Sequence, residues 1–467
     1  MALISLLSKP TLTFTYSMKY FHERASFNKF RVRSIRTIDA SPNVDLRIKR
    51  SEPEFILPAQ PAPIEMKPLS DLDSWDQIRV RAPFLIFYKR NPEMKERRDH
   101  GEVIKRALAE ALVYYYPLAG RLVPTIDTST GKTKLWVDCG RGASDAGVLF
   151  VKAEADIELT EVGDNVLAPN PCCTKQLLWT WEENFDKEFE SFTICGPLLS
   201  IQVTKFKCGG IALGVVAHHC VTDGYGISLF LAAMCEIARG QNVPSIPPIW
   251  LRDQFLCART HPQVTCAESE FRNKKDVLKI AIREMRETSP ISIVFDSKDV
   301  QTLRDRHNLQ SCTKYELITA CLWKCSTILR RPDPEEVTRL TSATSVRGTR
   351  AMIELPKGYY GNSILMPMSM CSVGHLVNKP LVHAVKLVKQ TKLRIRDPEY
   401  VRSFVDHIAT RPSIPDHRLR FFISDISQLG HERFDFGWGQ PVNVVSAIVI
   451  SMMRVAPVWL LNLSRQT

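Results

Sequence analysis

The sequence predicts a mixed α/β fold in two halves, and three observations lead to this prediction. The chain has 467 residues, 44% of them hydrophobic, which is longer than one average domain and enough for two cores. Segments that alternate apolar and polar residues like half-buried strands are interleaved with segments of helical spacing. A proline-rich stretch without periodicity, residues 243–275, separates the two halves.

Residues 54–242 carry the elements expected for a first domain. A helix is expected to begin near His100, because Ile104, Leu108 and Leu112 recur at helical spacing, and Pro117 should end it. An apolar helix is expected over Ile227–Gly240. The strands expected in this half are residues 132–139, Leu198–Lys207 and Ile211–Ala217. The last two are joined by Cys-Gly-Gly, which favours a hairpin.

Residues 243–275 are expected to form a crossover linker and residues 276–467 a second domain. In the second domain, a strand is expected over Ile291–Phe295 and a helix over Lys314–Leu329. No internal repeat is visible in the sequence.

Residues 1–53 are expected to form an extension that is disordered or resembles a transit peptide. Residues 1–50 hold ten of the 62 basic and three of the 50 acidic residues, which is +7 of the net charge of +12. A basic, acid-poor, serine- and threonine-rich segment is typical of an organelle transit peptide. A disordered extension or an incorrect gene start explains the same composition. The remaining charge of +5 argues against nucleic acid but allows a local basic pocket for a phosphorylated cofactor.

The cysteine and motif content narrows the class of protein further. The thirteen cysteines show no CxxC spacing, and their closest groupings are Cys172–Cys173 and Cys321 with Cys325. Free thiols in a reducing, cytoplasmic location are therefore expected, rather than zinc sites or a disulfide framework. No uncharged apolar stretch of about 18 residues exists, so no membrane span is expected. The histidines are dispersed and no GxGxxG or P-loop string occurs, so neither a metal nor a permanently bound cofactor is expected.

The string HHCVTDG, residues 218–224, lies between an all-apolar strand and a helix, where side chains can reach a cleft. A hydroxyl attacks a thioester poorly, so acyl transfer needs a base, and histidine ordinarily titrates near working pH. His219 is the candidate base. Asp223 either orients its imidazole directly or pins the loop through an ion pair with an arginine. A lone histidine at a strand end is more often structural, whereas the complete string is rare by chance.

A second string, DFGWG, comprises Asp435, Phe436, Gly437, Trp438 and Gly439. It holds no good nucleophile or base. Its glycines permit a tight turn that tucks the two aromatic rings inward, so a structural role is expected.

The two strings together resemble the signatures of the BAHD family of plant CoA-dependent acyltransferases, and HHxxxDG alone is also shared with peptide-condensing domains. Further stretches match the family in order between Glu54 and Pro441. These stretches are Tyr114–Leu122, Gln202–Gly210, Leu317–Trp323 and Leu355–Asn362. The chain looks most like the branch of alcohol benzoyl and acetyl transferases and taxane acyltransferases. A peptide-condensing domain would need a carrier-protein neighbour, for which the chain leaves no room.

The resemblance implies an α/β fold of two similar mixed-sheet domains with an interdomain channel. An acyl group such as acetyl or benzoyl would pass from acyl-CoA, the co-substrate, to the hydroxyl of a plant specialised metabolite. An amine is the less favoured acceptor. The partner would be a small-molecule alcohol and the protein a monomer. The residue matching Asp223 would point away from substrate and pair with an arginine, for which Arg347 is the candidate and Arg350 the rival. Ser424 matches a position that donates a hydrogen bond near the reacting oxygen, although a plain strand-end serine explains it equally well.

The C-terminal part departs from the family pattern after about residue 441. The family usually continues through further strands and a helix, whereas this chain ends 28 residues after Gly439 with an unrelated sequence. A frame shift, alternative splicing or a faulty gene model would explain this. Missing strands would expose a sheet edge. The alternative function is therefore an inactive paralogue that at most binds CoA or another ligand.

Overall fold

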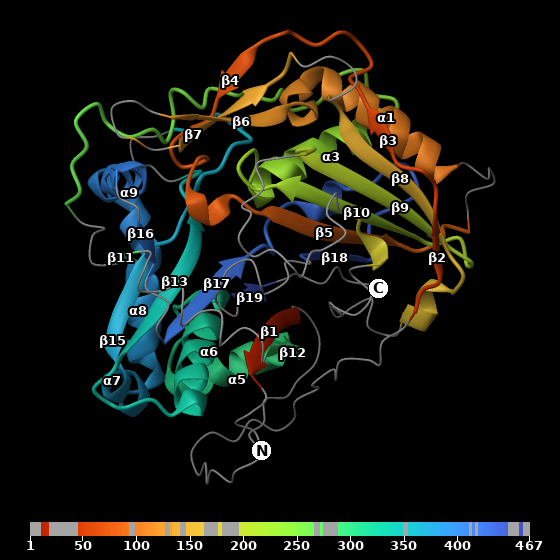
Figure 1. Ribbon diagram of the computed structural model, residues 1–467. Coiled ribbons are helices and arrows are strands. Elements are labelled where there is room, and N and C mark those ends of the chain that lie inside the picture. The colour runs from red at the N-terminus through yellow and green to blue at the C-terminus, as the bar shows by residue number, and fades with distance from the viewer. Residues whose placement is uncertain are drawn as a thin grey trace.

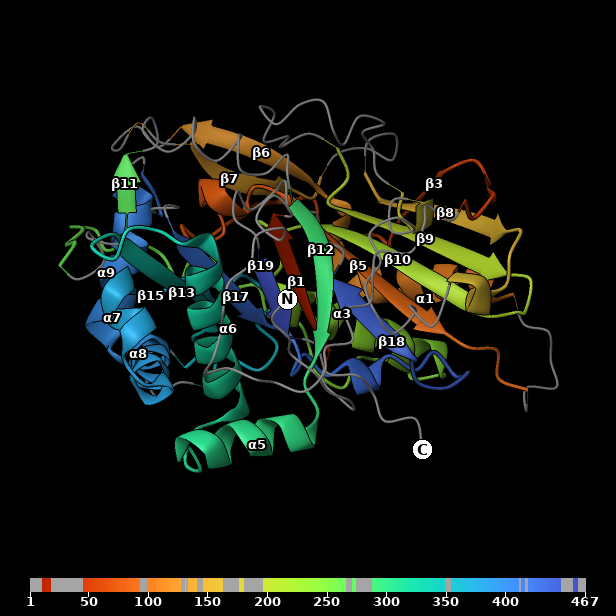
Figure 2. The same cartoon turned by 90° about the horizontal axis from the view of Figure 1, so that it is seen from below.

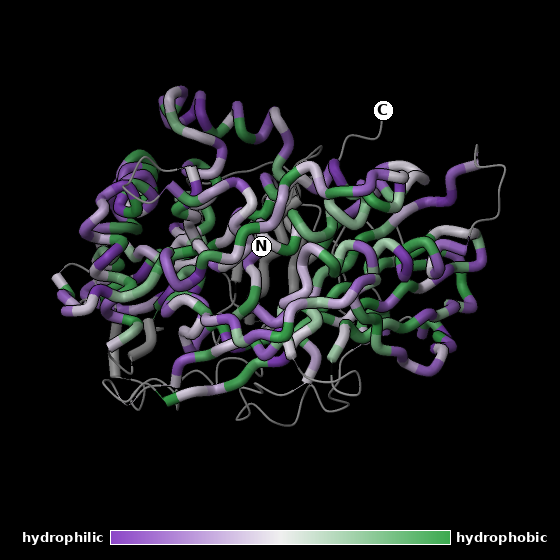
Figure 3. The backbone as a smooth tube through the Cα atoms, turned by 90° about the horizontal axis from the view of Figure 1, so that it is seen from above, coloured by the Kyte–Doolittle hydropathy of each residue, from purple (hydrophilic) through white to green (hydrophobic). Residues whose placement is uncertain are grey.

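The computed structural model builds the chain around two sheets that lie side by side (Figures 1 and 2). The structure describes residues 11–17, 45–92, 99–126, 131, 133–140, 146–162, 176–179, 196–265, 271–273, 288–348, 354–410, 413–415, 419–446 and 457–460. Hydrophobic backbone stretches run mainly through the interior, while hydrophilic ones are common at the periphery (Figure 3). In these parts of the chain, no helix is both long and apolar enough to cross a membrane.

The first sheet has β10 and β9 at its centre. Its strand order is β18 (Asn443–Ser446), β5 (Arg81–Tyr88), β10 (Ile211–His218), β9 (Leu199–Phe206), β8 (Val148–Ala155) and β2 (Ile48–Arg50), and β3 (Glu54–Ile56) also pairs with β8. Every residue of β5 and β10 is buried, because apolar side chains cover both faces. The alternation is visible in β5, where Phe84, Ile86 and Tyr88 enter one core and Leu85 and Phe87 another.

Two helices, α1 (His100–Tyr114) and α3 (Gly224–Ala238), pack against each other over one face of the first sheet (Figure 1). Helix α1 begins where it does because the Asp99 side chain accepts hydrogen bonds from the amides of Gly101 and Glu102. Pro117 lies in a following 3₁₀ turn, Tyr116–Ala119, and so ends the α-helix as expected.

The second sheet has β13 and β17 at its centre. Its strand order is β12 (Thr288–Val294), β1 (Thr11–Ser17), β19 (Pro457–Leu460), β17 (Arg420–Asp425), β13 (Val337–Ser345) and β14 (Ile364–Leu365), and β15 (Met368–Ser372) pairs with β13. The helices of this half are α5 (Ser297–His307), α6 (Lys314–Arg330), α7 (Val373–Asn378), α8 (Leu381–Leu393) and α9 (Pro398–Thr410). Helix α6 starts in a capping box formed by Thr313 and Glu316. Its apolar residues join those of α8 and β17 in one core.

Two small sheets complete the described structure. One contains β4 (Met66–Pro68), β7 (Thr133–Asp138) and β6 (Arg121–Ile126). The other pairs β11 (Phe271–Asn273) with β16 (Ser413–Pro415), so the region expected to be a linker contributes one short strand. Helix α9 packs on the first half, where Phe404 meets Trp75 edge to face with ring centroids 5.9 Å apart.

The expected hairpin is confirmed, since β9 and β10 pair antiparallel around Gly209, whose φ of +82° suits glycine. The segments near the two chain ends do not follow the expected division of the chain into two halves. Ordered strands begin before Glu54, because β2 pairs with β8, and residues 11–17 pair in the second sheet rather than lying outside the fold. Strand β18, from the second half of the chain, pairs with β5 in the first sheet. The domain limits at residues 53, 242 and 275 therefore stay predictions.

The last two segments that the structure describes, β18 and β19, are both strands of the large sheets. Strand β18 lies beside β5, and β19 lies between β1 and β17. The other residues after 446 lie outside the described parts. The expectation of missing strands therefore stays untested.

Candidate active site

A cavity of about 920 Å³ lies between the two halves of the molecule. Strands β5 and β10 contribute Ala82, Phe84 and Ala217, while β13 and β17 contribute Ala343 and Phe422. His219, Asp223, Arg347 and Ser424 also line this cavity. The four polar residues singled out by the sequence therefore meet in one place, although they come from both halves of the chain.

His219 directly follows β10, and its backbone amide donates to the carbonyl of Val80 over 2.7 Å, which fixes the strand end. Its imidazole Nδ1 lies 2.9 Å from Oδ1 of Asn362. Asn362 Nδ2 in turn donates to the backbone carbonyl of His219 over 2.7 Å. These contacts hold the ring, and within the described residues the structure gives its Nε2 no partner. Nε2 is thus the nitrogen left to meet a substrate in the cavity.

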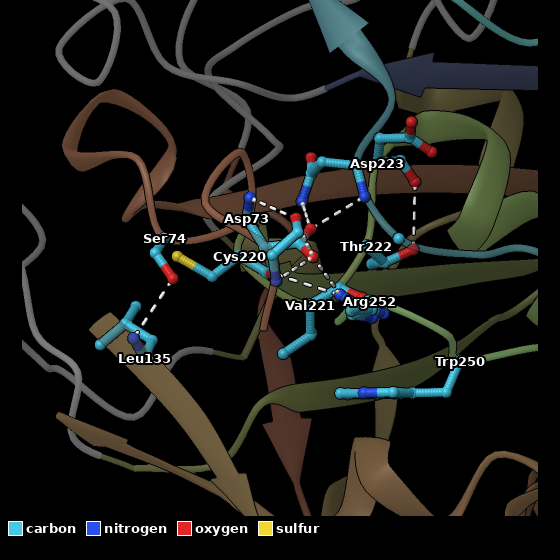
Figure 4. A network of polar contacts seen from close by, with 12 residues as sticks. Asp73, Ser74, Leu135, Cys220, Val221, Thr222, Asp223, Trp250 and Arg252 are labelled. Atoms are coloured by element: carbon cyan, nitrogen blue, oxygen red, sulfur yellow. Dashed lines mark hydrogen bonds and ion pairs between the residues drawn. The ribbon is translucent and has the colours of Figure 1, made fainter. Parts of the chain in front are cut away.

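Asn362 is itself held by a buried carboxylate. Its backbone amide and its Nδ2 both donate to Oδ1 of Asp73, over 2.9 and 2.7 Å. The other oxygen of Asp73 lies 3.2 Å from Nη1 of Arg252, and both side chains of this ion pair are fully buried. Figure 4 shows Asp73 and Arg252 close to the backbone of Cys220 and Val221, whose carbonyls Arg252 contacts.

Sequence reasoning did not identify Asn362, Asp73 and Arg252 as functional residues. Asn362 ends the Leu355–Asn362 stretch, so its position was visible, but nothing in that string shows which side chain it contacts. Asp73 and Arg252 lie 289 and 110 positions away from Asn362, and no local pattern joins them.

Asp223 caps α3, and its Oδ1 accepts a 2.9 Å hydrogen bond from the amide of Gly226. Its Oδ2 forms a 2.6 Å ion pair with Nη1 of Arg347 and accepts from the amide of Ser363 over 3.1 Å. Arg347 also donates from Nη2 to the carbonyl of Gly361 over 2.6 Å. Asp223 therefore ties the start of α3 to the loop that carries Asn362.

This geometry bears on the two roles left open for Asp223. Its described contacts go to an arginine and to backbone and hydroxyl groups, while the contact to the His219 imidazole comes from Asn362. The guanidinium of Arg347 also stacks over the ring of Tyr225, 4.4 Å from its centroid. Arg350 lies outside the described residues.

Gly226 allows the close approach of α3 to the second half. A Cβ at this position would lie 2.1 Å from the carbonyl oxygen of Tyr360 and 2.4 Å from Oγ1 of Thr222. Only glycine fits there without a backbone shift.

Ser424 lies near the end of β17, next to Asp425, and lines the same cavity as His219. Its hydroxyl can donate a hydrogen bond to a bound molecule. Its role near the reacting oxygen stays a prediction. Cys220, next to His219, is fully buried, and burial raises the pKa of its thiol, so it stays neutral and is a poor nucleophile.

The DFGWG string forms a compact turn, and none of its residues is among the described residues that line the cavity. Oδ1 of Asp435 accepts from the amides of Gly437 and Gly439 over 2.7 and 2.9 Å. Both glycines have a φ near +100°, which favours glycine. Phe436 and Trp438 are buried and stacked, with ring centroids 5.3 Å apart.

In the described parts of the chain, no group of three or more histidine, cysteine, aspartate or glutamate side chains is arranged to hold a metal ion.

The comparison with solved structures shows that other proteins share this two-lobed α/β fold. The solved structure of vinorine synthase has this fold, with a TM-score of 0.62 and 18% identity, covering 85% of this chain and 88% of that one. Fusarium graminearum TRI101 complexed with ethyl coenzyme A gives a TM-score of 0.61 and 14% identity, covering 82% of this chain and 89% of that one.

The sequence comparisons establish the family. The model of the Transferase family matches residues 46–458, so the chain belongs to this family, the BAHD acyltransferases that its motifs resemble. It is 37% identical over 404 residues to alcohol acyl transferase 1 (allele RGb) of Malus domestica, covering 85% of each chain. It is 38% identical over 399 residues to a benzyl alcohol O-benzoyltransferase of Nicotiana tabacum, covering 85% of this chain and 82% of that protein. The chain is thus an acyltransferase.

Proposed function

We propose that this enzyme transfers an acyl group, such as acetyl or benzoyl, from acyl-CoA to the hydroxyl of a small alcohol, with His219 as the general base. The observation that carries the proposal is the imidazole of His219 at the wall of the cavity between the two halves, with Nδ1 bound to Asn362 and Nε2 left for substrate. The names of the relatives from Malus domestica and Nicotiana tabacum favour an alcohol as acceptor.

The reaction follows from this arrangement. Nε2 of His219 takes the proton of the alcohol as its oxygen attacks the thioester carbon, and a tetrahedral intermediate forms. The hydroxyl of Ser424 donates to the negative oxygen of that intermediate. The intermediate collapses as the carbon–sulfur bond breaks, and the imidazolium returns the proton to the CoA sulfur. The products are an ester and free CoA thiol. The base contributes a factor of about 10²–10⁴ to the rate enhancement.

The remaining rate enhancement comes from holding both substrates in one cavity. Apolar residues from both sheets, including Phe84, Met366 and Phe422, line it and suit an apolar acceptor or an aryl group. Lys357 also lines it and can meet an anionic group of CoA. We also propose that the enzyme acts as a monomer. The described cysteines are all free, which supports a reducing, cytoplasmic location.

The test pairs acetyl-CoA and benzoyl-CoA with a panel of aliphatic, benzylic and terpenoid alcohols and detects products by mass spectrometry. The proposal predicts an ester whose mass equals donor acyl plus alcohol, formed in step with free thiol. Thiol release at the same rate with and without alcohol would identify a thioesterase instead. Specific binding of CoA without product from any pair would favour the inactive paralogue.

A further inference from the structure

A chain of buried polar contacts runs from Arg252 through Asp73 and Asn362 to His219. The three distances are 3.2 Å from Arg252 Nη1 to Asp73 Oδ2, 2.7 Å from Asn362 Nδ2 to Asp73 Oδ1, and 2.9 Å from Asn362 Oδ1 to His219 Nδ1. Asp73 and Arg252 are fully buried and Asn362 is 2% exposed, so water does not compete for these groups. Figure 4 shows Asp73 and Arg252 facing each other within this network.

The carboxylate of Asp73 decides which way the amide of Asn362 points. An ionised carboxylate only accepts hydrogen bonds, and Asp73 has the positive charge of Arg252 beside it. The NH₂ group of Asn362 must therefore face Asp73, where it also reaches the carbonyl of His219 over 2.7 Å. This leaves the amide oxygen to face the imidazole. An amide orientation is ordinarily an open choice, but here the chemistry of the neighbour fixes it.

The orientation of the amide then fixes the imidazole tautomer. Because Oδ1 of Asn362 only accepts, Nδ1 of His219 must carry a hydrogen. In the neutral ring, Nε2 then holds the lone pair. This is the form that a base directed into the cavity requires.

We propose that Asp73 is a positioning residue that, through Asn362, holds His219 as the Nδ1–H tautomer with Nε2 free to accept a proton. Arg252 supplies the counter-charge of Asp73 in the buried site. The inference rests on the proposed role of His219 as the base. It assigns a catalytic consequence to Asp73 and Arg252, which are not among the described residues that line the cavity.

The substitution Asp73→Asn is expected to reverse the network. The new amide oxygen must stay beside Arg252, so the new NH₂ group faces the NH₂ group of Asn362. Asn362 then has to turn its oxygen toward position 73 and its NH₂ group toward Nδ1 of His219. That ring nitrogen becomes an acceptor and Nε2 becomes N–H, which cannot take a proton from the alcohol.

Exchanging the two side chains restores the direction of the hydrogen bond to Nδ1 of His219. In Asp73→Asn/Asn362→Asp, the NH₂ group at position 73 donates to the carboxylate at position 362. That carboxylate has no donor, so it again accepts from Nδ1 of His219. The double variant should recover part of the activity that the single variant loses, because Nδ1 of His219 has its acceptor again. The recovery is partial, since the backbone amide of residue 362 now meets the NH₂ group at position 73 and the carboxylate at position 362 cannot donate to the carbonyl of His219.

The experiment measures kcat and KM for donor and alcohol in the wild type, Asp73→Asn and the double variant, together with thermal unfolding. A wrong tautomer costs about 10⁴-fold in kcat in the serine proteases. We expect Asp73→Asn to lose at least about 100-fold in kcat with each KM within about threefold, since the cavity wall is intact. The double variant should regain about tenfold or more of that loss. Unchanged kcat in Asp73→Asn would overturn the proposal.

A matched control separates the tautomer from the general cost of breaking a buried ion pair. Asp406 on α9 is also fully buried and pairs with Arg259 over 2.6 Å, but it does not line the cavity. Asp406→Asn should lower the unfolding temperature and leave kcat within about threefold, as expected for a site that acts on stability alone. Equal kcat losses in Asp406→Asn and Asp73→Asn would mean that Asp73 has only a structural role.

If Asp73→Asn does not fold, Asn362→Ala keeps the Asp73–Arg252 pair and removes the acceptor for Nδ1, together with the Nδ2 donor to Asp73 and to the His219 carbonyl. It should lose kcat by a similar factor, and full activity would overturn the proposal. Nitrogen-15 NMR of labelled histidine, with His219→Ala to assign the signal, reads the tautomer without turnover. A wild type that acylates no alcohol defeats the proposed function, whereas an Nε2–H signal for His219 in the wild type defeats the positioning role.

Discussion

Oδ2 of Asp223 and Nη1 of Arg347 lie 2.6 Å apart. This ion pair joins the start of α3, in the first half of the chain, to the segment that directly follows β13, in the second half. The Asp223 side chain is fully buried and Arg347 is 13% exposed, so the pair is shielded from solvent. The loop that carries Asn362 is held to the same carboxylate through Ser363. The aspartate of the HHxxxDG string thus helps to hold the loop whose Asn362 contacts the imidazole of His219.

Arg347→Met should destabilise the fold strongly, because it leaves the Asp223 carboxylate buried without its counter-charge. The expected loss in the free energy of unfolding is about 3–5 kcal/mol. The double variant Asp223→Asn/Arg347→Met should lose less than the sum of the single variants. Urea unfolding of the four proteins in the cycle measures the coupling, and additive losses would show that the two residues act independently.

Gly226→Ala should disturb the contact between α3 and the loop at Tyr360, because the added Cβ would lie 2.1 Å from a backbone oxygen. We expect a loss of about 1–3 kcal/mol or more in stability. Gly224→Ala is the matched control on the same helix, since its Cβ meets only the side chain of Leu429 at 3.0 Å. Thermal unfolding compares the two, and equal stabilities would contradict the packing account.

The DFGWG turn is expected to affect stability rather than the chemical step. Trp438→Ala should cost about 3–5 kcal/mol, because it removes a buried ring that stacks on Phe436 and meets His100 edge to face. Trp438→Phe should cost less, since Nε1 of Trp438 has no hydrogen-bond partner in the described structure. Turnover per folded molecule should stay near the wild-type value in Trp438→Phe. A selective fall in kcat there would point to a role in the reaction.

His431, in the 3₁₀ turn His431–Arg433 before that string, should make stability depend on pH. Burial lowers the pKa of its imidazole to about 4, while nearby Glu432 opposes the shift weakly. The folded pKa lies below the unfolded value of about 6.5, so the neutral ring's contribution is complete above pH 6.5 and is lost as the pH falls toward 4. Urea midpoints between pH 7.5 and 4.5 should fall less steeply in His431→Gln than in the wild type. Parallel slopes would contradict this assignment.

The sequence predicted the interior of the first half well because its signals are local. The apolar run of β10, the spacing in α1 and the proline that ends it are each readable within a few residues. Strand β1 was missed although Leu12, Phe14 and Tyr16 alternate with polar residues, which is a strand signal. The basic composition around it outweighed that pattern. Its partners, β12 and β19, are hundreds of residues away along the chain.

The sequence predicted the site residues that lie in or near the strings shared with the family. His219, Asp223, Arg347 and Ser424 line one cavity, yet the partner of the imidazole is Asn362. Pairings of this kind depend on how distant loops fold against each other, and one sequence carries no local record of them. The same limit applied to Asp223, whose two possible roles differ only in the direction of its side chain.

The proposed function depends on His219 taking the proton of the acceptor alcohol. A comparison of the wild type with His219→Ala tests this role. Alcohol-dependent release of CoA thiol is measured for the wild type and His219→Ala, with unfolding temperature and CoA binding determined on the same samples. If His219 is the base, His219→Ala should fold, bind CoA normally and turn over at least about 100-fold more slowly. Undiminished turnover in a folded His219→Ala variant would exclude His219 as the base.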